Sequence, residues 1–323
     1  MGNRKRYAKR GGAARTGLVL RTSLLVAVST LTLGTLSACG GSSSGSNDSP
    51  STSTKTAAAT ATETAKTDFK ALLPADIASA GKISVATTPT YPPYEYLDTD
   101  GKTIIGMNAD VMEELGDLFG VEIEWSSVAQ FGTLVPGIAS GRYDTAIIFE
   151  DIPERQKVVD LVDFYRDALA FLGAKDAEFG DTTACGKSVA VGTGNGPALL
   201  APDLNKVLCT DKGLPSMDIK NFANTDGQFT ALTSRRVDYV LISSTVAKLF
   251  VKENPDFDLR SDAVAHTTRA IPVAKEKTEL RAAFEAGLQE LIDNGTMKKI
   301  MDKWDTADGF VPKVTVNVAG SVK

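Results

Sequence analysis

Three short stretches carry groups that suit the binding of a small polar molecule. In "TYPPY", two prolines keep the chain extended and hold the ring of Tyr91 after a strand, where open α/β sheets bind ligands. In "PERQK", Arg155 carries a guanidinium, which offers two parallel donors to a carboxylate and stays charged when buried. In "GTGNG", residues 192–196, a glycine-rich turn precedes a helix whose amides and dipole favour an anion.

The N-terminus has the pattern of a secretory signal. Residues 1–21 contain seven basic side chains and no acid, and the apolar run "LLVAVSTLTLGTLSA" follows. The segment "LSACGG" resembles a bacterial lipobox, which predicts a signal peptide over residues 1–38 and lipidation of Cys39. The alternative is an ordinary signal peptide with an unrelated cysteine. Residues 39–67 are small and polar, so we expect a flexible linker there.

The charge of the chain argues against nucleic acid as a partner. The full sequence has 35 basic and 40 acidic side chains, a net charge of −5. Removal of residues 1–38, which hold seven of the basic side chains, leaves 28 against 40, a net charge of −12. Binding to phosphates requires a basic surface, which this composition does not supply.

Few residues could bind a metal or act as a nucleophile. The chain has one histidine, His266, and two cysteines beyond Cys39, namely Cys185 and Cys209. Outside the cytoplasm such a pair is most simply a disulfide, and a metal site is the rival interpretation, short of ligands. His266 has no assignable partner for catalysis and is interpreted as a surface or hinge residue. We therefore expect no metal and no cofactor.

Strand and helix patterns alternate along the rest of the chain. Residues 82–88 are predicted to form a strand, 107–120 a helix that stops at Gly120, 121–125 a strand, 134–141 a short helix and 143–149 a strand. The order repeats with a strand at 187–192, a helix and strand within 229–244, and two final helices at 278–295 and 296–304. This order predicts an α/β fold with a parallel sheet covered by helices.

Six segments in this order resemble a known family. They are "YPPYEYLDTDGKTIIGMNADVMEELGDLFGVEIEW", "FGTLVPGIASGRYDTAI", "PERQKVVDLVDFY", "GKSVAVGTG", "SRRVDYVLIS" and "DNGTMKKIMDKW". Together they are similar to the extracytoplasmic solute-binding proteins of amino-acid ABC importers, over residues 82–304. The cysteine pair and the lipobox resemble lipoprotein members from Gram-positive, actinobacterial cells.

The resemblance implies the type II periplasmic-binding-protein fold, with two lobes of mixed sheet and helices joined by two crossings. Lobe 1 would hold residues 68–170 and 268–323, and lobe 2 would hold residues 171–267 with the disulfide. The segments "YRDALAFLGAK" and "TTRAIPVAK" are short apolar runs suited to the two crossings.

The resemblance also implies the ligand-binding residues. Tyr91 and Phe131 would form aromatic walls around the ligand, and Arg155 would bind its α-carboxylate. The turn containing Thr193, Gly194 and Asn195 would bind the same carboxylate from lobe 2. The simpler alternatives are that Tyr91 fills the core of the lobe and that Arg155 forms a surface ion pair with Glu154 or Asp160.

Two positions depart from the family pattern. A Ser or Thr is usual five residues before the arginine, where this chain has Glu150, and the acid that usually pairs with the ligand's ammonium is replaced by Ser243. Our hypothesis is that Glu150 or Asp151 supplies the missing negative charge, so that the ligand is still a small zwitterion or cation. The competing hypothesis is that Glu150 pairs with Arg155 and that the ligand is not an α-amino acid.

The predicted function is therefore capture of a small polar solute for delivery to a membrane ABC permease. We expect a monomer anchored by lipid to the outer face of the cell membrane, without enzymatic activity. The alternatives are an extracytoplasmic enzyme of the same fold, similar to a dehydratase, and a component that presents its ligand to a sensor.

Overall fold

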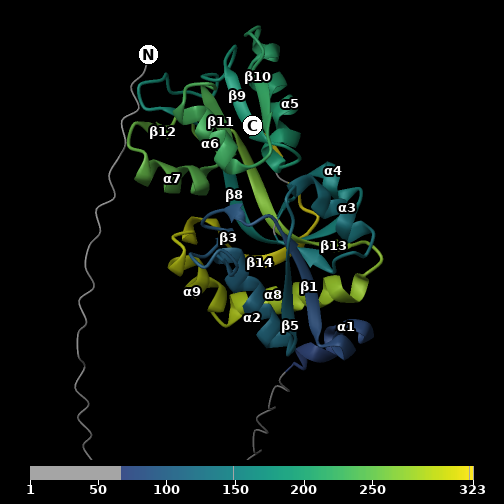
Figure 1. The fold of residues 1–323 in the computed structure, drawn as a ribbon. Coiled ribbons are helices and arrows are strands. Elements are labelled where there is room, and N and C mark those ends of the chain that lie inside the picture. The colour runs from purple at the N-terminus through teal and green to yellow at the C-terminus, as the bar shows by residue number, and fades with distance from the viewer. Residues whose placement is uncertain (1–66, 148, 320, 323) are drawn as a thin grey trace, which may run out of the picture. The chain divides into compact units, whose positions relative to one another are not determined.

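The computed structural model describes residues 67–147, 149–319 and 321–322 (Figure 1). The predicted signal peptide, Cys39 and all but the last residue of the predicted linker lie outside these residues. Within the described part of the chain, no helix combines the length and the apolar character needed to cross a membrane.

The first lobe, here called lobe 1, is built on three parallel strands. β1 (Lys82–Thr87) pairs in parallel with β5 (Glu122–Ser127) on one side and β6 (Thr145–Ala146) on the other. The helix α2 (Met107–Phe119) packs on them through a buried apolar stripe and ends at Gly120, whose φ of 64° is the left-handed conformation that glycine adopts without strain. The short elements are η1 (Phe69–Leu72), α1 (Ala75–Ala80), β2 (Thr90–Tyr91), β3 (Glu95–Leu97), β4 (Ile104–Ile105), η2 (Phe131–Thr133), α3 (Leu134–Ala139), β7 (Phe149–Glu150) and α4 (Pro153–Gln156).

Two long strands connect lobe 1 to the other lobe. β8 (Val159–Ala174) and β13 (Ala265–Ala274) pair antiparallel along the whole of β13, and Figure 1 shows both running from one lobe to the other. Their register shifts between Arg269 and Ala270. Irregularities of this kind redirect side chains and occur next to functional sites. The predicted lobe limits, at residues 170 and 267, fall inside these two strands.

Lobe 2 repeats the strand–helix order. β9 (Ser188–Gly192) lies between β10 (Asp218–Phe222) and β11 (Tyr239–Ser243), parallel to both. The remaining elements are α5 (Gly196–Leu208), η3 (Thr210–Lys212), α6 (Thr225–Thr233), α7 (Ser244–Glu253) and β12 (Phe257–Leu259). The sheet is therefore mixed, because β11 and β12 pair antiparallel with β8. The parallel sheet expected from element order is present within each lobe and is interrupted by the crossing strands.

The predicted disulfide between Cys185 and Cys209 is confirmed. The two sulfurs are bonded and the Cα atoms lie 5.5 Å apart. The bond joins the turn before β9 to the residue that ends α5, so it closes a strand–turn–helix unit.

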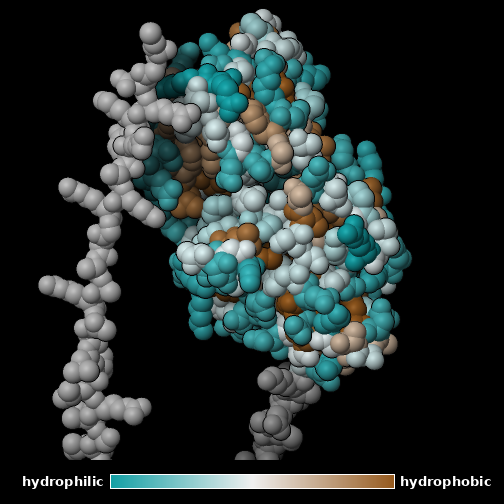
Figure 2. Space-filling view, in the orientation of Figure 1, coloured by the Kyte–Doolittle hydropathy of each residue, from teal (hydrophilic) through white to brown (hydrophobic). Residues whose placement is uncertain are grey.

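The end of the chain returns to lobe 1. α8 (Thr278–Asp293) and α9 (Thr296–Lys303) pack on α2, and Met297 and Met301 are buried in the core of the lobe. After η4 (Ala307–Gly309), β14 (Phe310–Val316) pairs with β8, and β15 (Ser321–Val322) pairs with β13. Figure 2 shows a face that is mostly hydrophilic, with hydrophobic side chains in separate patches.

Candidate ligand-binding site

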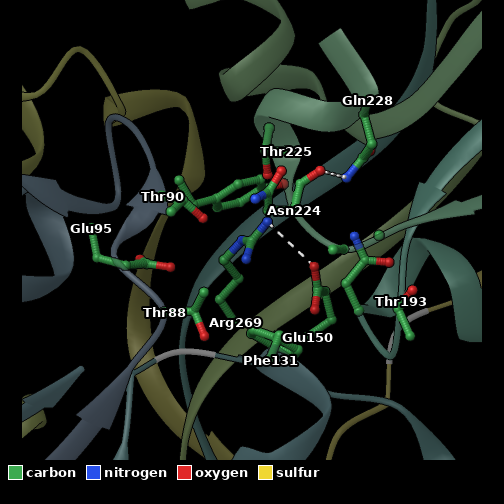
Figure 3. A pocket seen from close by; sticks show the side chains of 14 residues that line it. Thr88, Thr90, Glu95, Phe131, Glu150, Thr193, Asn224, Thr225, Gln228 and Arg269 are labelled. Atoms are coloured by element: carbon green, nitrogen blue, oxygen red, sulfur yellow. Dashed lines mark hydrogen bonds and ion pairs between the residues drawn. The ribbon is translucent and has the colours of Figure 1, made fainter. Parts of the chain in front are cut away.

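A cavity lies between the two lobes, where the strand ends of both meet the crossing strand β13. The volume of the cavity is about 50 Å³, below the range of roughly 300–1,000 Å³ usual for small-molecule sites. Figure 3 shows its polar side chains converging from both lobes. The lining residues are Thr88, Thr90, Tyr91, Glu95, Phe131, Glu150, Gly192, Thr193, Asn195, Ala223, Asn224, Thr225, Gln228 and Arg269.

Two aromatic rings of lobe 1 form walls of the cavity. Tyr91 follows β1 by four residues and stacks on the buried Tyr94 with ring centres 5.7 Å apart. Phe131 packs on Phe149 with ring centres 4.8 Å apart. Each of these half-buried rings is therefore held by a second ring behind it, so both walls are fixed before a ligand arrives.

Arg269 of β13 lies at the centre of the cavity. Its Nη2 is 2.6 Å from Oδ2 of Asp167 on β8, and its Nε donates to the same oxygen at 2.7 Å. The guanidinium carbon also lies 4.5 Å from the ring centre of Tyr94 and 5.5 Å from that of Tyr91. Burial acts to lower the pKa of Arg269, but Asp167 and Glu150 raise it well above its usual value. The side chain is thus a fixed positive charge.

Arg155 lies beside this cavity and not in it. Its Nη1 donates to the backbone oxygen of Glu150 at 2.9 Å and to Oε2 of the same residue at 3.0 Å. Its Nη2 donates to the backbone oxygen of Gly194 at 3.1 Å, which joins lobe 1 to lobe 2. The guanidinium packs on Phe149 and Phe131, and only 4% of Arg155 is exposed. With Gly194 it lines a neighbouring pocket.

Glu150 connects the two guanidinium groups. Its Oε1 lies 3.5 Å from Nη2 of Arg269, while its Oε2 accepts the bond from Arg155. Burial acts to raise the pKa of Glu150, but Arg269 and Arg155 hold it below its usual value. Glu150 is therefore ionised and lies between two cations.

Glu95 is the acid of the cavity without a cation of its own. It is 5% exposed, and the Asn108 side-chain amide donates to its Oε2. No ion pair joins Glu95 to a Lys, Arg or His of the described chain. Burial raises its pKa well above the usual value, although Arg269 opposes the shift. A cation entering the cavity would stabilise the charged form of this carboxylate.

Lobe 2 contributes uncharged polar groups from two helix starts. Asn195 precedes α5 and its side chain accepts a bond from the Ala198 amide at 2.9 Å. Asn224 precedes α6 and accepts one from the Gly227 amide at 2.9 Å. The buried Oε1 of Gln228 has no hydrogen-bond partner within residues 67–319. It is an acceptor at the wall of the cavity, available to a donor on a ligand.

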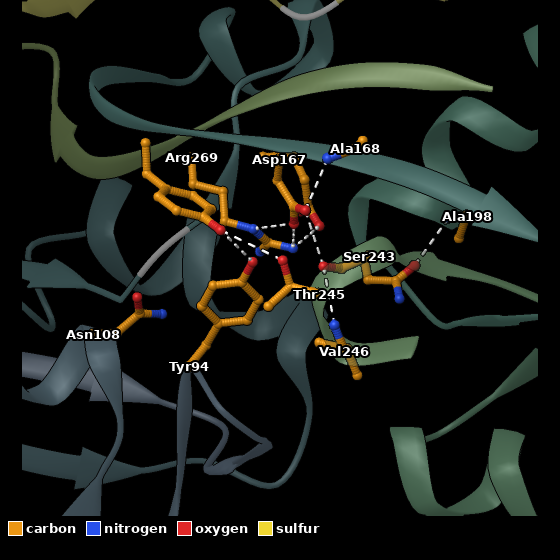
Figure 4. Close-up of polar contacts among 12 residues, drawn as sticks. Tyr94, Asn108, Asp167, Ala168, Ala198, Ser243, Thr245, Val246 and Arg269 are labelled. Carbon is orange, nitrogen blue, oxygen red and sulfur yellow. Dashed lines mark hydrogen bonds and ion pairs between the residues drawn. The ribbon is translucent and has the colours of Figure 1, made fainter. Parts of the chain in front are cut away.

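Two of the predicted site residues lie elsewhere. Ser243 is buried at the end of β11, where it donates to Oδ1 of Asp167 at 3.0 Å (Figure 4). Asp151 is buried at the start of the turn after β7 and accepts a bond from Gln156 at 2.7 Å. Neither lines the cavity. Ser243 orients Asp167, which in turn holds Arg269.

The structure thus brings together part of the predicted set. Five predicted residues line the cavity: Tyr91, Phe131, Glu150, Thr193 and Asn195. Arg155 and Gly194 do not line this cavity but line the pocket next to it. The sequence interpretation missed Glu95 and Arg269, although each is a charged residue inside an otherwise apolar or aromatic run, "YPPYEY" and "TTRAIPVAK". That contrast is a usable signal for a functional side chain.

Metal binding and histidine chemistry find no support in the described residues. No group of His, Cys, Asp and Glu side chains there has the arrangement of a metal site. His266 lies on β13 with an exposed side chain, outside the lining of the main cavity.

A cavity between two α/β lobes joined by two long strands defines the class of the periplasmic solute-binding proteins. Residues 83–307 match the bacterial extracellular solute-binding proteins, family 3, and the chain belongs to that family. It is the solute-binding component of an ABC importer.

The relatives and solved structures similar to this chain include several that are named for binding arginine or were solved with arginine bound. The arginine-binding protein ArgT of Corynebacterium glutamicum is 26% identical over 77% of this chain and 83% of its own length. The arginine-binding extracellular protein ArtP of Bacillus subtilis is 27% identical over 70% and 87%. The crystal structure of AbpA from Streptococcus pneumoniae bound to L-arginine superposes with a TM-score of 0.64, at 26% identity, over 72% of this chain and 98% of that one.

Proposed function

We propose that the cavity between the lobes captures a small solute with at least one ammonium or guanidinium group, an amino acid or a related compound. The observation that carries this proposal is Glu95, a buried carboxylate that lines the cavity without a cation partner. A buried charge is costly unless it is paired, so a solute cation supplies the missing partner. The names of the arginine-binding relatives agree with a cationic solute.

The aromatic and polar walls have separate roles in this proposal. Tyr91 and Phe131 present ring faces, which attract cations and pack on apolar chains. Thr193 and Asn195 contact the solute from lobe 2. Glu150 contacts it from lobe 1 and is held in place by Arg155.

Capture is mechanical and depends on closure of the lobes. We assign residues 68–170 and 268–323 to lobe 1 and residues 171–267 to lobe 2. The lobes touch at Gly194, where a Cβ would lie 3.0 Å from Cα of Gly132, and through the bond from Arg155 to the Gly194 oxygen. A solute that contacts both lobes favours this closed state by the difference in its affinity for the two states.

The remaining assignments complete the proposal. Cys39 carries the lipid anchor after removal of residues 1–38, the protein acts as a monomer, and the closed form docks on an ABC permease. Asp151, Ser243 and Gly194 act on the solute indirectly, through the side chains that they position. The solute leaves chemically unchanged, because the protein has no catalytic role.

Calorimetry of the purified protein against the twenty amino acids, betaines, amines and guanidines tests the proposal. We expect binding of at least one compound with an ammonium or guanidinium group, and recovery of that compound unchanged after long incubation. Loss of uptake of the same compound in a deletion strain would link binding to import. Absence of binding by every ammonium- or guanidinium-bearing compound would refute the proposal.

A further inference from the structure

The first relevant feature is that the hydrogen bonds of Arg155 all go to groups of the described chain. Its three hydrogen bonds go to the backbone and carboxylate of Glu150 and to the backbone of Gly194. Its faces are covered by Phe149 and Phe131. A solute carboxylate would compete with Glu150 for this guanidinium.

The second feature is that the protein also neutralises Arg269. Asp167 binds its Nε and Nη2 at 2.7 and 2.6 Å, and Glu150 lies 3.5 Å from the same Nη2. Asp167 is itself fixed, because Ser243 and the Ala168 amide donate to its other oxygen. Arg269 is therefore already ion-paired with a carboxylate of the protein before any solute binds.

The third feature is the position of Glu150 against lobe 2. A Cβ placed on Gly196, the first residue of α5, would lie 2.5 Å from Cδ of Glu150. The Glu150 carboxylate thus sits between the guanidinium of Arg155 and the positive end of the α5 dipole, which is where an anion is stabilised. An anionic group of the protein already fills the place best suited to a solute carboxylate.

Three groups at the cavity can accept a hydrogen bond from the solute: the carboxylate of Glu95, the unpartnered Oε1 of Gln228 and the Oγ1 of Thr88, which also lacks a partner within the described residues. One donor of the lining, Nη2 of Arg269, also lacks a hydrogen bond there, but Asp167 and Glu150 already balance its charge. Glu95 and Glu150 both line the cavity, so a solute carboxylate there would meet the charge of Glu150 and would oppose the ionisation of Glu95. A donor-rich cation would meet complementary groups on both lobes.

We infer that the solute of this protein is an organic cation without a carboxylate, a primary amine or a guanidine, and that Glu150 excludes the corresponding amino acids. This inference rests on the proposed function and narrows it. It sets this chain apart from relatives whose names specify arginine. Glu150 acts here as a specificity-determining residue, since it occupies Arg155 and repels a solute carboxylate.

Matched pairs of compounds that differ by one carboxylate test the inference directly. Calorimetry of the purified protein would compare agmatine with arginine, putrescine with ornithine, and cadaverine with lysine. We expect at least one decarboxylated compound to bind about tenfold or more tighter than its amino acid, because the buried carboxylate of the latter has no free cation. Equal or tighter binding of the amino acid in every pair that binds would overturn the inference. If no compound of either set and no other ammonium or guanidine binds, the proposed function itself fails.

The variant Glu150→Gln tests whether Glu150 is the residue that excludes the amino acids. It removes the negative charge that balances Arg155, so we expect the preference for the decarboxylated compound to fall by about tenfold or more. The ratio of the two affinities is an internal measure that a general loss of stability does not change. Glu122→Gln removes an equally charged but exposed side chain of β5 and should leave the ratio unchanged. An unchanged ratio in Glu150→Gln would contradict the role of Glu150, and the wild-type comparison decides the inference if this variant does not fold.

Discussion

Gly196 of lobe 2 lies directly against the side chain of Glu150 of lobe 1. A Cβ on Gly196 would stand 2.5 Å from Cδ and 2.6 Å from Oε2 of Glu150, distances that no pair of unbonded heavy atoms of this kind tolerates. Glu150 cannot move aside freely because Arg155 holds its carboxylate. The absence of a side chain at position 196 is therefore a condition for the closed arrangement of the lobes.

The substitution Gly196→Ala should hinder closure and weaken solute binding. Overpacking typically costs about 1–3 kcal/mol, which corresponds to a rise in Kd of roughly fivefold to 150-fold. The residue begins a helix and its clash is with the other lobe, so we expect little change in the melting temperature without solute. Calorimetry and thermal unfolding give the two readouts.

Gly132→Ala is the matched control for this experiment. It lies on lobe 1 near the lobe contact, but a Cβ there would meet no atom within 4 Å. Its Kd should equal that of the wild type. Unaltered binding in Gly196→Ala would contradict the closed arrangement as the solute-bound one.

The substitution Glu95→Gln should abolish most of the affinity for a cationic solute. It keeps the shape of the side chain and an acceptor oxygen but removes the charge, so we expect Kd to rise about tenfold or more. Because burial raises the pKa of Glu95, its ionised form is less favoured as the pH falls, and wild-type affinity should decrease from alkaline to acidic pH. Titrations at several pH values check this, and Glu95→Gln should show weak and nearly pH-independent binding.

The stability of the solute-free protein should increase as the pH falls, which is opposite to the change expected for its affinity. A carboxyl whose pKa is raised by folding contributes stability below its unfolded pKa and loses it as the pH rises through the folded value. Glu95→Gln should therefore not destabilise the protein at neutral pH. A marked drop in its melting temperature would indicate that Glu95 is needed for the fold and not reserved for a solute.

The sequence predicted the architecture well because it is encoded locally. Apolar spacing fixes α2, and a glycine ends it where a left-handed residue is needed. Tyr91 could be predicted for a similar reason, since it follows the end of a strand, whereas Phe131 is predicted only from the resemblance to the family.

The charge network could not be predicted because it joins residues far apart in sequence. Arg269 and Asp167 are 102 residues apart and meet only because β8 and β13 pair antiparallel across both lobes. The resemblance to the family and the chemistry of a guanidinium both assign Arg155 to the solute, but the position of Glu150, which pairs with it, depends on the turn between β7 and α4. The competing hypothesis of a Glu150–Arg155 ion pair matches the geometry.

Asp163 and Asp151 form a second buried acidic pair, which should make stability depend on pH. Burial, with Asp151 as a neighbouring charge, raises the pKa of Asp163 to about 8 from 3.8. The folded state then binds more protons than the unfolded state between about pH 4 and 8, so stability should fall as the pH rises through this window. The substitution Asp163→Asn should flatten this dependence, as measured by urea unfolding at pH 5 and at pH 8.5.

Asp160 provides the control on the same strand. Burial acts to raise its pKa, but Asn317 and Arg281 hold it below the usual value, so its contribution has the opposite sign. Asp160→Asn should lower stability at neutral pH, and the stability of this variant should still decrease as the pH rises from 4 to 8. If the stability of wild type and of Asp163→Asn depends on pH in the same way, the raised pKa of Asp163 is not the cause of that dependence.

The disulfide between Cys185 and Cys209 should stabilise the unit that presents Thr193 and Asn195 to the solute. Its cysteines are 24 residues apart, and closing a loop of this length contributes about 3 kcal/mol by restricting the unfolded chain. The double substitution Cys185→Ser and Cys209→Ser should reduce the free energy of unfolding by about that amount, and a reducing agent should do the same to the wild type but not to the variant. Since the bond ties the turn before β9 to the end of α5, its loss should also loosen the turn between them and weaken solute binding. Equal unfolding of the wild type with and without the reductant would show that the bond adds nothing to stability.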